Sequence, residues 1–286
     1  MGSPSAASTR VVKTTIQRQF YRNGQIREEI PLRSGRRHGI ARTWHNNGQL
    51  MSEEPYQNGL LHGVCRQWSE TGRLLGKYRM IHGTGVQRLW HDNGKRHLEL
   101  FSVNGDMSGC YRLWLHDGTL LSKEIYLRGR MVTAKKYRAA REKDPSLPKL
   151  IGGAVRSWPK TRAAEKHMHE VFFRYLLRRP NRFEARHWLE SSGQRKRALG
   201  RFKRESDALK LVEQLYMAGA SEVIAPDVYS SKAGDQFADC LLVRLPSIAA
   251  RRKAIRKIAA LLSKRKLGDF QPEKDIGETH LYFLLA

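Results

Sequence analysis

The sequence predicts an α+β protein in which an array of antiparallel β-hairpins precedes a region of alternating helices and strands. Four tryptophans recur at a nearly constant spacing, and Asn-Gly or Asp-Gly pairs separate segments of strand length. Beyond about residue 160 the apolar residues recur at helical spacing instead. We therefore expect a flexible N-terminus over 1–17, repeats over 18–132, a linker over 133–159, a helical segment over 160–191 and a final domain over 192–286.

The repeats are defined by their tryptophans and glycines. Trp44, Trp68, Trp90 and Trp114 are separated by 24, 22 and 24 residues. A glycine lies five residues before each tryptophan and another lies four residues after it. Glycine adopts positive φ without strain, so each pair brackets one short strand between two turns. A single hairpin cannot bury a tryptophan, whereas stacked neighbours can, and we expect one elongated meander of nine or ten strands.

The glycine and aromatic pattern resembles that of a known repeat family. The segments Gly35-Arg36-Arg37-His38-Gly39 and Asn58-Gly59-Leu60-Leu61-His62-Gly63 each precede a strand that ends in Trp, and they resemble MORN repeats. The longer spacing is similar to that of the bacterial YwqK family of antitoxins, and the resemblance covers residues 18–132. The third and fourth repeats depart from it, because Gly83-Thr84-Gly85 and Met107-Ser108-Gly109 lack the His-Gly pair.

The resemblance implies a non-enzymatic scaffold. We expect an antitoxin-like or adaptor module that holds a protein partner through the repeat sheet, with a cognate toxin or another acidic protein as that partner. The family resemblance also implies a bacterial source and a toxin–antitoxin system. MORN repeats elsewhere are associated with anionic lipids as well as proteins, so association with anionic lipid stays open.

The sequence of the final region predicts a definite order of helices and strands. A helix is predicted over 160–179, where Pro180 stops it. Strands are then expected over 196–202, 222–228, 237–245 and 279–285, with helices over 206–218 and 247–264. This β-α-β-β-α-β order is that of the ferredoxin-like fold. That fold carries many unrelated functions, so the order alone does not assign one.

Composition restricts the compartment and the partners. The net charge of +26 favours acidic partners, which include nucleic acid, anionic membranes and acidic proteins. Only three cysteines occur, which fits a reducing compartment and excludes a disulfide framework. The first residues lack the apolar core of a signal peptide, and no apolar run approaches the length of a membrane span. We expect a cytoplasmic protein.

No catalytic, cofactor or metal motif is present in the sequence, so we expect no enzyme activity and no cofactor. His167 and His169 are two residues apart on the first predicted helix and point in different directions, which predicts two solvated histidines rather than a metal site. An acidic segment without the spacing of a calcium loop is expected to form a solvated loop; its members are Asp269, Glu273, Asp275 and Glu278.

Two sets of residues are candidates for binding. The first is the tryptophan row together with an arginine two residues before each tryptophan, namely Arg42, Arg66, Arg88 and Arg112. These arginines form either an anion-binding row or a structural one that stacks on tryptophan or pairs with Glu29, Glu53 and Glu99.

The second set lies on the last predicted helix and includes Arg252, Arg256 and Lys257. It is either a solvated face or a contact for phosphates. The alternative function is therefore binding of the nucleic-acid backbone through the basic C-terminal domain. The predicted central strands lack the exposed aromatic residues that RNA-recognition domains use, which favours the protein-binding hypothesis.

Overall fold

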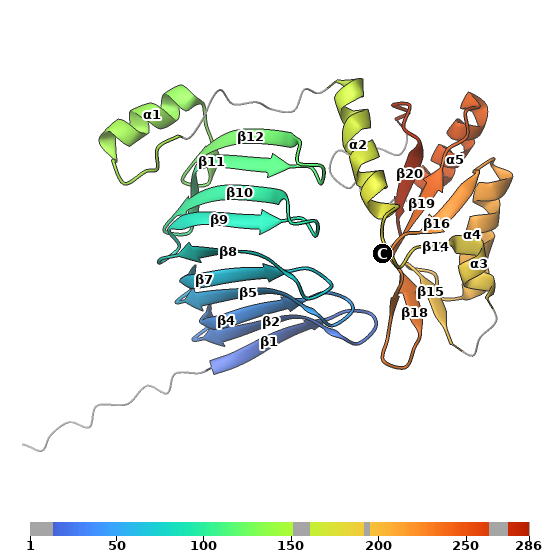
Figure 1. The fold of residues 1–286 in the computed structure, drawn as a ribbon, viewed down its shortest axis with the longest axis horizontal. Helices are drawn as coiled ribbons and strands as arrows, with labels where there is room; N and C mark the ends of the chain where they lie inside the picture. Colours follow the sequence, from blue (N-terminus) through green and yellow to red (C-terminus); the bar gives the residue numbers. More distant parts are fainter. Residues whose placement is uncertain (1–13, 151–160, 192–194, 263–273, 286) are drawn as a thin grey trace, which may run out of the picture.

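The computed structural model describes residues 14–150, 161–191, 195–262 and 274–285. The repeats begin with an 8-stranded antiparallel sheet in the order β1-β2-β4-β5-β7-β8, with β3 and β6 beside β2 and β5 (Figure 1). Its strands are β1 (Thr14–Phe20), β2 (Ile26–Arg33), β3 (Arg36–Arg37), β4 (Gly39–Trp44), β5 (Leu50–Gln57), β6 (Leu60–Leu61), β7 (Gly63–Trp68) and β8 (Leu74–Met80). The first strand thus starts inside the predicted flexible N-terminus, which corrects that boundary.

The array continues as a second, 5-stranded sheet rather than as one unbroken meander. This sheet contains β9 (Gly85–Trp90), β10 (Arg96–Val103), β11 (Asp106–Trp114), β12 (Leu120–Leu127) and β13 (Arg130–Met131). Among the described residues the only β-bridge between the two sheets is Ile81 with Thr84. The predicted single meander of nine or ten strands is therefore wrong at the boundary between β8 and β9.

The break falls in the short third repeat, where Trp90 approaches β8 with its side chain. A Cβ atom at Gly76 would lie 2.3 Å from the Trp90 ring, so the ring occupies the space that a side chain on β8 would need. The Gln67 side chain supplies hydrogen bonds to the Trp90 backbone, donating to its carbonyl at 2.8 Å and accepting from its N–H at 3.0 Å. Side-chain contacts thus replace the regular ladder here.

The turns that follow each tryptophan are joined by a repeated hydrogen bond. A side chain just after one aromatic position donates a hydrogen bond to the carbonyl oxygen of the tryptophan 23 residues further on. Tyr21 reaches Trp44 at 2.7 Å, His45 reaches Trp68 at 3.0 Å, and His91 reaches Trp114 at 2.9 Å. We call this series the turn ladder. It aligns the turns along one edge of the array.

The end of the array is covered by a helix that the sequence analysis assigned to a linker. Helix α1 (Ala134–Lys143) starts after Thr133, whose side chain accepts a hydrogen bond from the Lys136 N–H. Tyr137 is fully buried and packs with Ile125 of β12 and with Leu147. The segment 134–150 is therefore part of the array, which corrects the linker expected over 133–159. Its residues 151–159 lie outside the described part of the chain.

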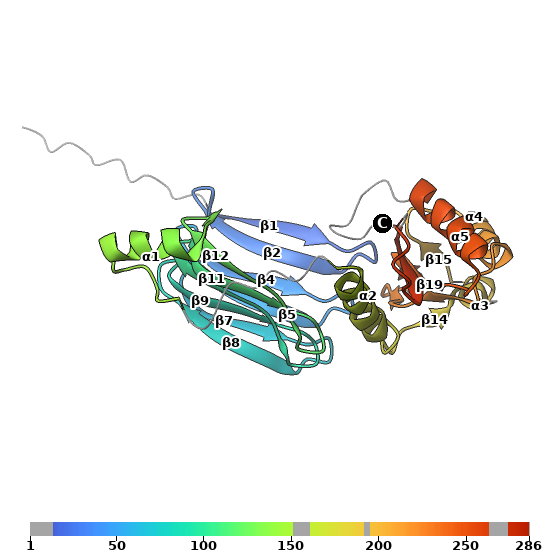
Figure 2. The same ribbon diagram turned by 90° about the horizontal axis from the view of Figure 1, so that it is seen from above.

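The C-terminal part is a sheet with helices on both faces (Figures 1 and 2). Helix α2 packs on one face through Phe173 and Leu176, which contact Ile224 and Leu242. Adjacent strand residues point to the opposite face and form the largest core with α3, α4 and α5. The elements are α2 (Arg162–Leu176), β14 (Phe183–Glu184), α3 (Ala185–Glu190), β15 (Arg197–Leu199), α4 (Glu205–Met217), β16 (Glu222–Ala225), β17 (Tyr229–Ser230), β18 (Gln236–Ala238), β19 (Cys240–Arg244), α5 (Ala249–Leu262) and β20 (His280–Leu284).

The order of these elements agrees with the expectation, but the strand pairing is not that of a ferredoxin-like sheet. The main sheet has the order β14-β16-β19-β20, and β15 lies outside it, parallel to β18 in a 3-stranded sheet with β17. The predicted third strand is divided at Asp239, whose carboxylate accepts from the Tyr229 hydroxyl at 2.7 Å and pairs with Arg22 of the repeats. No helix in the described ranges is long and apolar enough to span a membrane.

Candidate binding cavity between the repeat turns and helix α2

The turn edge of the array faces the C-terminal part (Figures 1 and 2). In the first turn, Arg22 pairs with Asp239 at 3.0 Å and the Asn23 amide donates to the carbonyl of Ser230 at 3.0 Å. In the last turn, Asp117 lies 3.5 Å from the His167 imidazole of α2. One ladder of turns therefore contacts both α2 and the β17–β18 hairpin.

Arg179 forms the most buried of these connections. Its guanidinium lies 2.6 Å from Glu70 in a repeat turn and 2.8 Å from Asp227 in the C-terminal part, and its side chain is 8% exposed. It also donates to the Tyr175 hydroxyl at 3.3 Å. A guanidinium that bridges two carboxylates in a partly dry site is held by strong hydrogen bonds, so Arg179 fixes α2 against the turns.

A cavity of about 730 Å³ opens between the turns and the C-terminal part. Trp68, Trp90 and Trp114 line its repeat side. The opposite wall comes from α2 and β20 and contains Met168, Phe172, Tyr175, Tyr282 and Leu284. This volume lies within the range of sites that hold organic ligands or the side chains of a partner. Its walls are largely aromatic and aliphatic, so it suits a group with an apolar body.

Histidines also line this cavity. Burial lowers the pKa values of His91, His97 and His169 below the ordinary value, which keeps these three rings neutral at pH 7. The His116 imidazole lies 2.6 Å from the Asp92 carboxylate, and its ring is 4.6 Å from the ring of Tyr175. The cavity therefore contains polar groups of which most carry no net charge.

Only part of the predicted tryptophan row lies at the cavity. Trp68, Trp90 and Trp114 line the cavity, whereas Trp44 does not. All four rings are partly exposed, as expected for residues at the edge of a stacked array. The turn ladder and α2 bring Trp68, Trp90 and Trp114 to one cavity. The spacing of the tryptophans in the sequence does not predict that arrangement.

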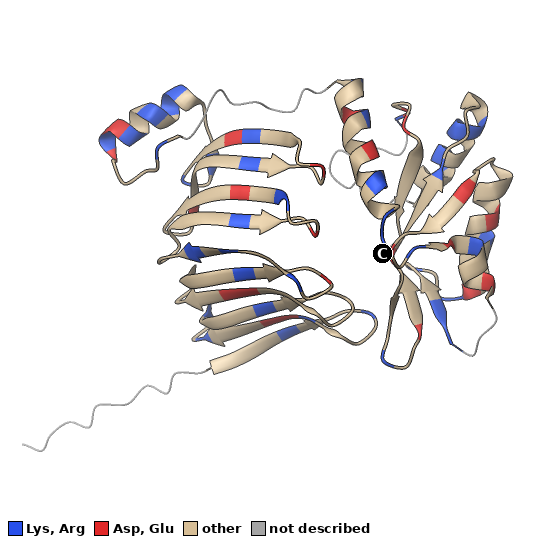
Figure 3. Ribbon diagram, viewed as in Figure 1, with Lys and Arg blue, Asp and Glu red and all other residues tan. Residues whose placement is uncertain are grey.

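The arginine row lies outside the cavity and pairs with strand glutamates. Strand register places Arg42 between Glu29 and Glu53, and Figure 3 shows the row as blue and red bands across the array. The interpretation as pairs with strand glutamates is confirmed. The distances are 3.0 Å for Arg42–Glu53, 3.9 Å for Arg66–Glu53, 3.1 Å for Arg88–Glu99 and 3.0 Å for Arg112–Glu99.

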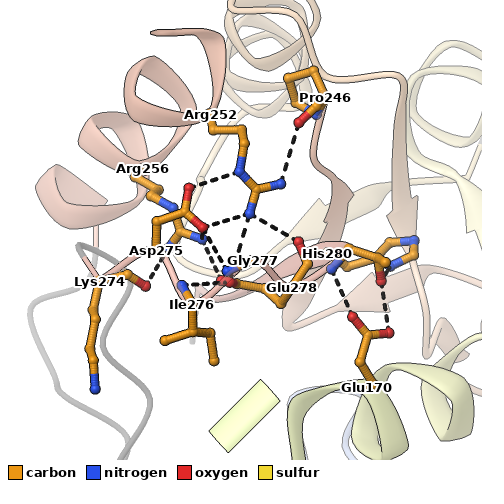
Figure 4. A network of polar contacts seen from close by, with 11 residues as sticks. Glu170, Pro246, Arg252, Arg256, Lys274, Asp275, Ile276, Gly277, Glu278 and His280 are labelled. Carbon is orange, nitrogen blue, oxygen red and sulfur yellow. Dashed lines mark hydrogen bonds and ion pairs between the residues drawn. The ribbon is translucent and has the colours of Figure 1, made fainter. Parts of the chain in front are cut away.

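The basic helix α5 uses two of its arginines internally (Figure 4). Arg252 donates two hydrogen bonds to Asp275, at 2.7 and 2.8 Å, and Arg256 pairs with the buried carboxylate of Glu278. The expectation of a solvated acidic loop is therefore wrong for Glu278, which is buried, whereas Asp275 is exposed but paired with Arg252. Lys257 remains exposed, beside a smaller cavity of about 390 Å³. Asp269 lies outside the described residues, as does Glu273.

Sequence reasoning missed three residues of the site. His169 was expected to be solvated, yet it is 7% exposed and lines the cavity. Tyr175 was assigned only to the apolar face of its helix, and Arg179 was not singled out. The available signal was the apolar stripe of Met168, Phe172 and Tyr175, because α2 needs one stripe for the C-terminal core and a second for the cavity.

Two of the cysteines are packing residues. Burial raises the pKa of the Cys65 thiol to about 11 and that of Cys240 to about 12, which disfavours the reactive thiolate. Across the described ranges, no three His, Cys, Asp or Glu side chains gather in an arrangement that could hold a metal ion. What the cavity offers is an apolar volume with aromatic walls, which is suited to binding.

The paired strands, the left-handed glycines and the turn ladder define the first part of the chain as a β-repeat array. The family model described as MORN repeat variant matches residues 13–33 and 37–58, so this stretch carries MORN-variant repeats. No curated protein matches the chain significantly.

Proposed function

We propose that the chain is a non-enzymatic binding scaffold, antitoxin-like or adaptor-like, that holds a protein partner through its MORN-variant repeats. The cavity between the turns and α2 carries this proposal, because three successive repeats each place a tryptophan in it. Tryptophan is enriched among the residues that dominate the energy of protein interfaces, where it pairs with an anchor side chain in a pocket. The partner's anchor enters the cavity, and the surrounding turns contact the rest of its surface.

The repeat spacing supports a more specific proposal about the source and the partner. Its similarity to YwqK antitoxins supports a bacterial cytoplasmic protein whose partner is a cognate toxin. The positive charge of the whole chain favours a partner with an acidic surface around the anchor and accelerates their encounter.

A displayed peptide library selected on the full chain tests the cavity. The matched variants are Leu75→Arg, which places a charge in the cavity wall, and Leu74→Arg at the neighbouring residue, which is 49% exposed and outside the wall. We expect Leu75→Arg to weaken the selected peptides by about tenfold or more, as measured by fluorescence anisotropy, and Leu74→Arg to change affinity little. Equal effects of the two substitutions would contradict the proposal.

The alternative is nucleic-acid binding through α5, and it is supported by the exposed side chains of Lys253 and Lys257. Arg252 and Arg256 do not support it, because both are engaged by the acidic loop. Binding to phosphates weakens steeply with salt, by a log–log slope of about −0.7 to −0.9 per contact. Tight, sequence-selective binding at physiological salt that is lost in a Lys253→Ala, Lys257→Ala variant would favour this alternative over the scaffold.

A further inference from the structure

The residues that line the cavity differ in charge type from the chain as a whole. The protein contains 53 Lys and Arg against 27 Asp and Glu. Of the described residues that line the cavity, however, none is Lys or Arg, whereas Glu70 and Asp92 are both present. Further carboxylates, Asp117 and Asp227, lie in contact with residues of the same interface. The lining of the cavity thus contains carboxylates and no lysine or arginine, although the chain as a whole is strongly basic.

The carboxylates at this wall retain capacity for another donor. Asp92 receives the His116 imidazole on one oxygen, and its side chain is 39% exposed. Glu70 and Asp227 share the single guanidinium of Arg179, and the His45 imidazole lies 3.9 Å from Glu70. An ionised carboxylate accepts about four hydrogen bonds, which leaves acceptor positions at each of these groups.

The rings of the wall already hold cations of the chain itself. The Arg96 guanidinium lies 5.4 Å from the centroid of the Trp90 ring, and the Arg179 guanidinium lies 5.8 Å from that of Tyr175. Both distances are typical of cation–π attraction, which is strongest for tryptophan. The neutral state of His91, His97 and His169 adds no positive charge that would repel a further cation.

We propose that the cavity selects a basic side chain, so that the anchor of the protein partner is a Lys or Arg residue. The aliphatic stem of that side chain packs on the tryptophans and leucines, and its cationic head reaches Glu70 and Asp92. This inference rests on the proposed function and names the chemistry of the partner's anchor. It also separates two regions of the partner, with a basic anchor at the cavity and acidic surface around it.

Three probes with one aromatic body and different charges test the selectivity: 1-naphthylmethylammonium, 1-naphthylmethanol and 1-naphthylacetate. Their affinities for the full chain are measured by calorimetry at pH 7.5. We expect the cation to bind more tightly than the neutral alcohol by about fivefold or more, and the anion to bind most weakly. Binding of the anion as tight as that of the cation would overturn the inference while leaving the cavity as a binding site. Failure of all three probes to bind would overturn the inference and the proposed function together.

The variants Glu70→Gln and Asp92→Asn locate the source of the selectivity. The readout is the ratio of cation to alcohol affinity within one variant, because a general loosening of the interface lowers both affinities. We expect this ratio to fall toward one in each variant and to stay unchanged in Asp106→Asn, which alters an exposed carboxylate outside the cavity. A ratio unchanged by both cavity substitutions would overturn the role of these carboxylates.

A second experiment distinguishes binding of a protein side chain from binding of a free amine. In peptides selected on the chain, replacing the basic residue by norleucine retains the apolar stem and removes the charge. We expect affinity to fall about tenfold, as for a lost charge-assisted contact in a partly dry site. A library that returns apolar anchors without any basic residue would overturn the inference even if the naphthyl cation binds.

Discussion

Arg256 has a role that its sequence context conceals. It lies among arginines and lysines on α5, where a solvated or phosphate-binding face was an obvious interpretation. Its side chain is instead 5% exposed and is paired with Glu278, which is 2% exposed, while Asp275 lies 3.4 Å away. Asp275 and Glu278 therefore form one network with Arg252 and Arg256 of the basic helix.

Replacing Arg256 by Ala should destabilise the protein strongly. The substitution leaves the buried Glu278 carboxylate without its main counter-charge, and breaking a buried pair in this way costs about 3–5 kcal/mol. Lys257→Ala, at the exposed neighbour, is the control and should change the free energy of unfolding by less than about 0.5 kcal/mol. Urea denaturation of the full chain measures both. Similar values for the two variants would show that Arg256 is not held as the structure indicates.

Gly76 shows how one missing side chain determines the local packing. Trp90 lies over it and packs against the cluster of Cys65, Tyr78 and Met80. We expect Gly76→Ala to cost about 1–3 kcal/mol, because a methyl group would overlap the ring. In a Trp90→Leu background the same substitution should be nearly neutral. Additive effects of the two substitutions, measured by denaturation, would contradict the contact.

At the scale of elements, α1 ends the array that the tryptophans begin. Its apolar residues Ala134, Tyr137 and Ala140 recur at helical spacing over less than two turns, surrounded by lysines and arginines. A stripe this short does not distinguish a docked helix from a polar linker before its target is known. The structure identifies a docked helix because Tyr137 packs against Ile125 of β12.

Tyr137→Ala should loosen the end of the array. Tyr137 is fully buried and its hydroxyl donates to the Pro148 carbonyl at 3.0 Å, so its loss should cost about 3 kcal/mol. Hydrogen exchange should rise in β11 and β12 and stay unchanged in β4 and β5, because repeats contact only their neighbours. Arg138→Ala is the exposed control. Uniform exchange across both sheets would indicate that the array unfolds as one unit.

The sequence predicted the elements better than their assembly. Tryptophan and glycine spacing located the hairpins, and helical periodicity located α2, α4 and α5 within a few residues. The break between β8 and β9 depends on a two-residue shortening whose effect appears only when Trp90 meets Gly76. The displacement of β15 from the main sheet depends on Asp239, where contacts from Tyr229 and Arg22 interrupt a strand of otherwise suitable residues. All three cavity tryptophans are binding candidates by sequence, whereas the opposite wall of the cavity is not.

At the scale of the molecule, Arg179 joins the two parts. The division into separately folding units remains a prediction, and the Arg179 contacts make it testable. We expect Arg179→Ala to separate the array from the C-terminal part, because Glu70 and Asp227 would then face each other without a cation. Small-angle scattering should report a larger radius of gyration, whereas Arg178→Ala should not change it. An unchanged radius in Arg179→Ala would show that the remaining turn contacts suffice.

Acidification should weaken the same interface. The pKa values of His91 and His97 are lowered by burial, so the docked state takes up fewer protons than the separated state as the pH falls below the ordinary value of about 6.5. Stability of the docked state should therefore fall as the pH drops below about 6.5, and affinity for a neutral naphthyl probe should fall with it. The counter-charges facing His91 are Asp92 and Asp117, which reduce the effect. A His97→Phe variant should show a shallower pH dependence, whereas His187→Gln, outside the cavity, should retain the original profile.

The turn ladder also limits how this protein can change over time. Each rung joins positions 23 residues apart, and the first and last turns are held by separate parts of the C-terminal structure, at Asp239 and at His167. An open solenoid can gain or lose a unit by duplication or deletion of its coding segment. Here an added repeat would carry the last turn away from α2, and a deleted one would leave α2 without a partner. The C-terminal part thus restricts the number of repeats. We expect related chains that combine such an array with this C-terminal part to conserve repeat number even where the sequences of their strands diverge.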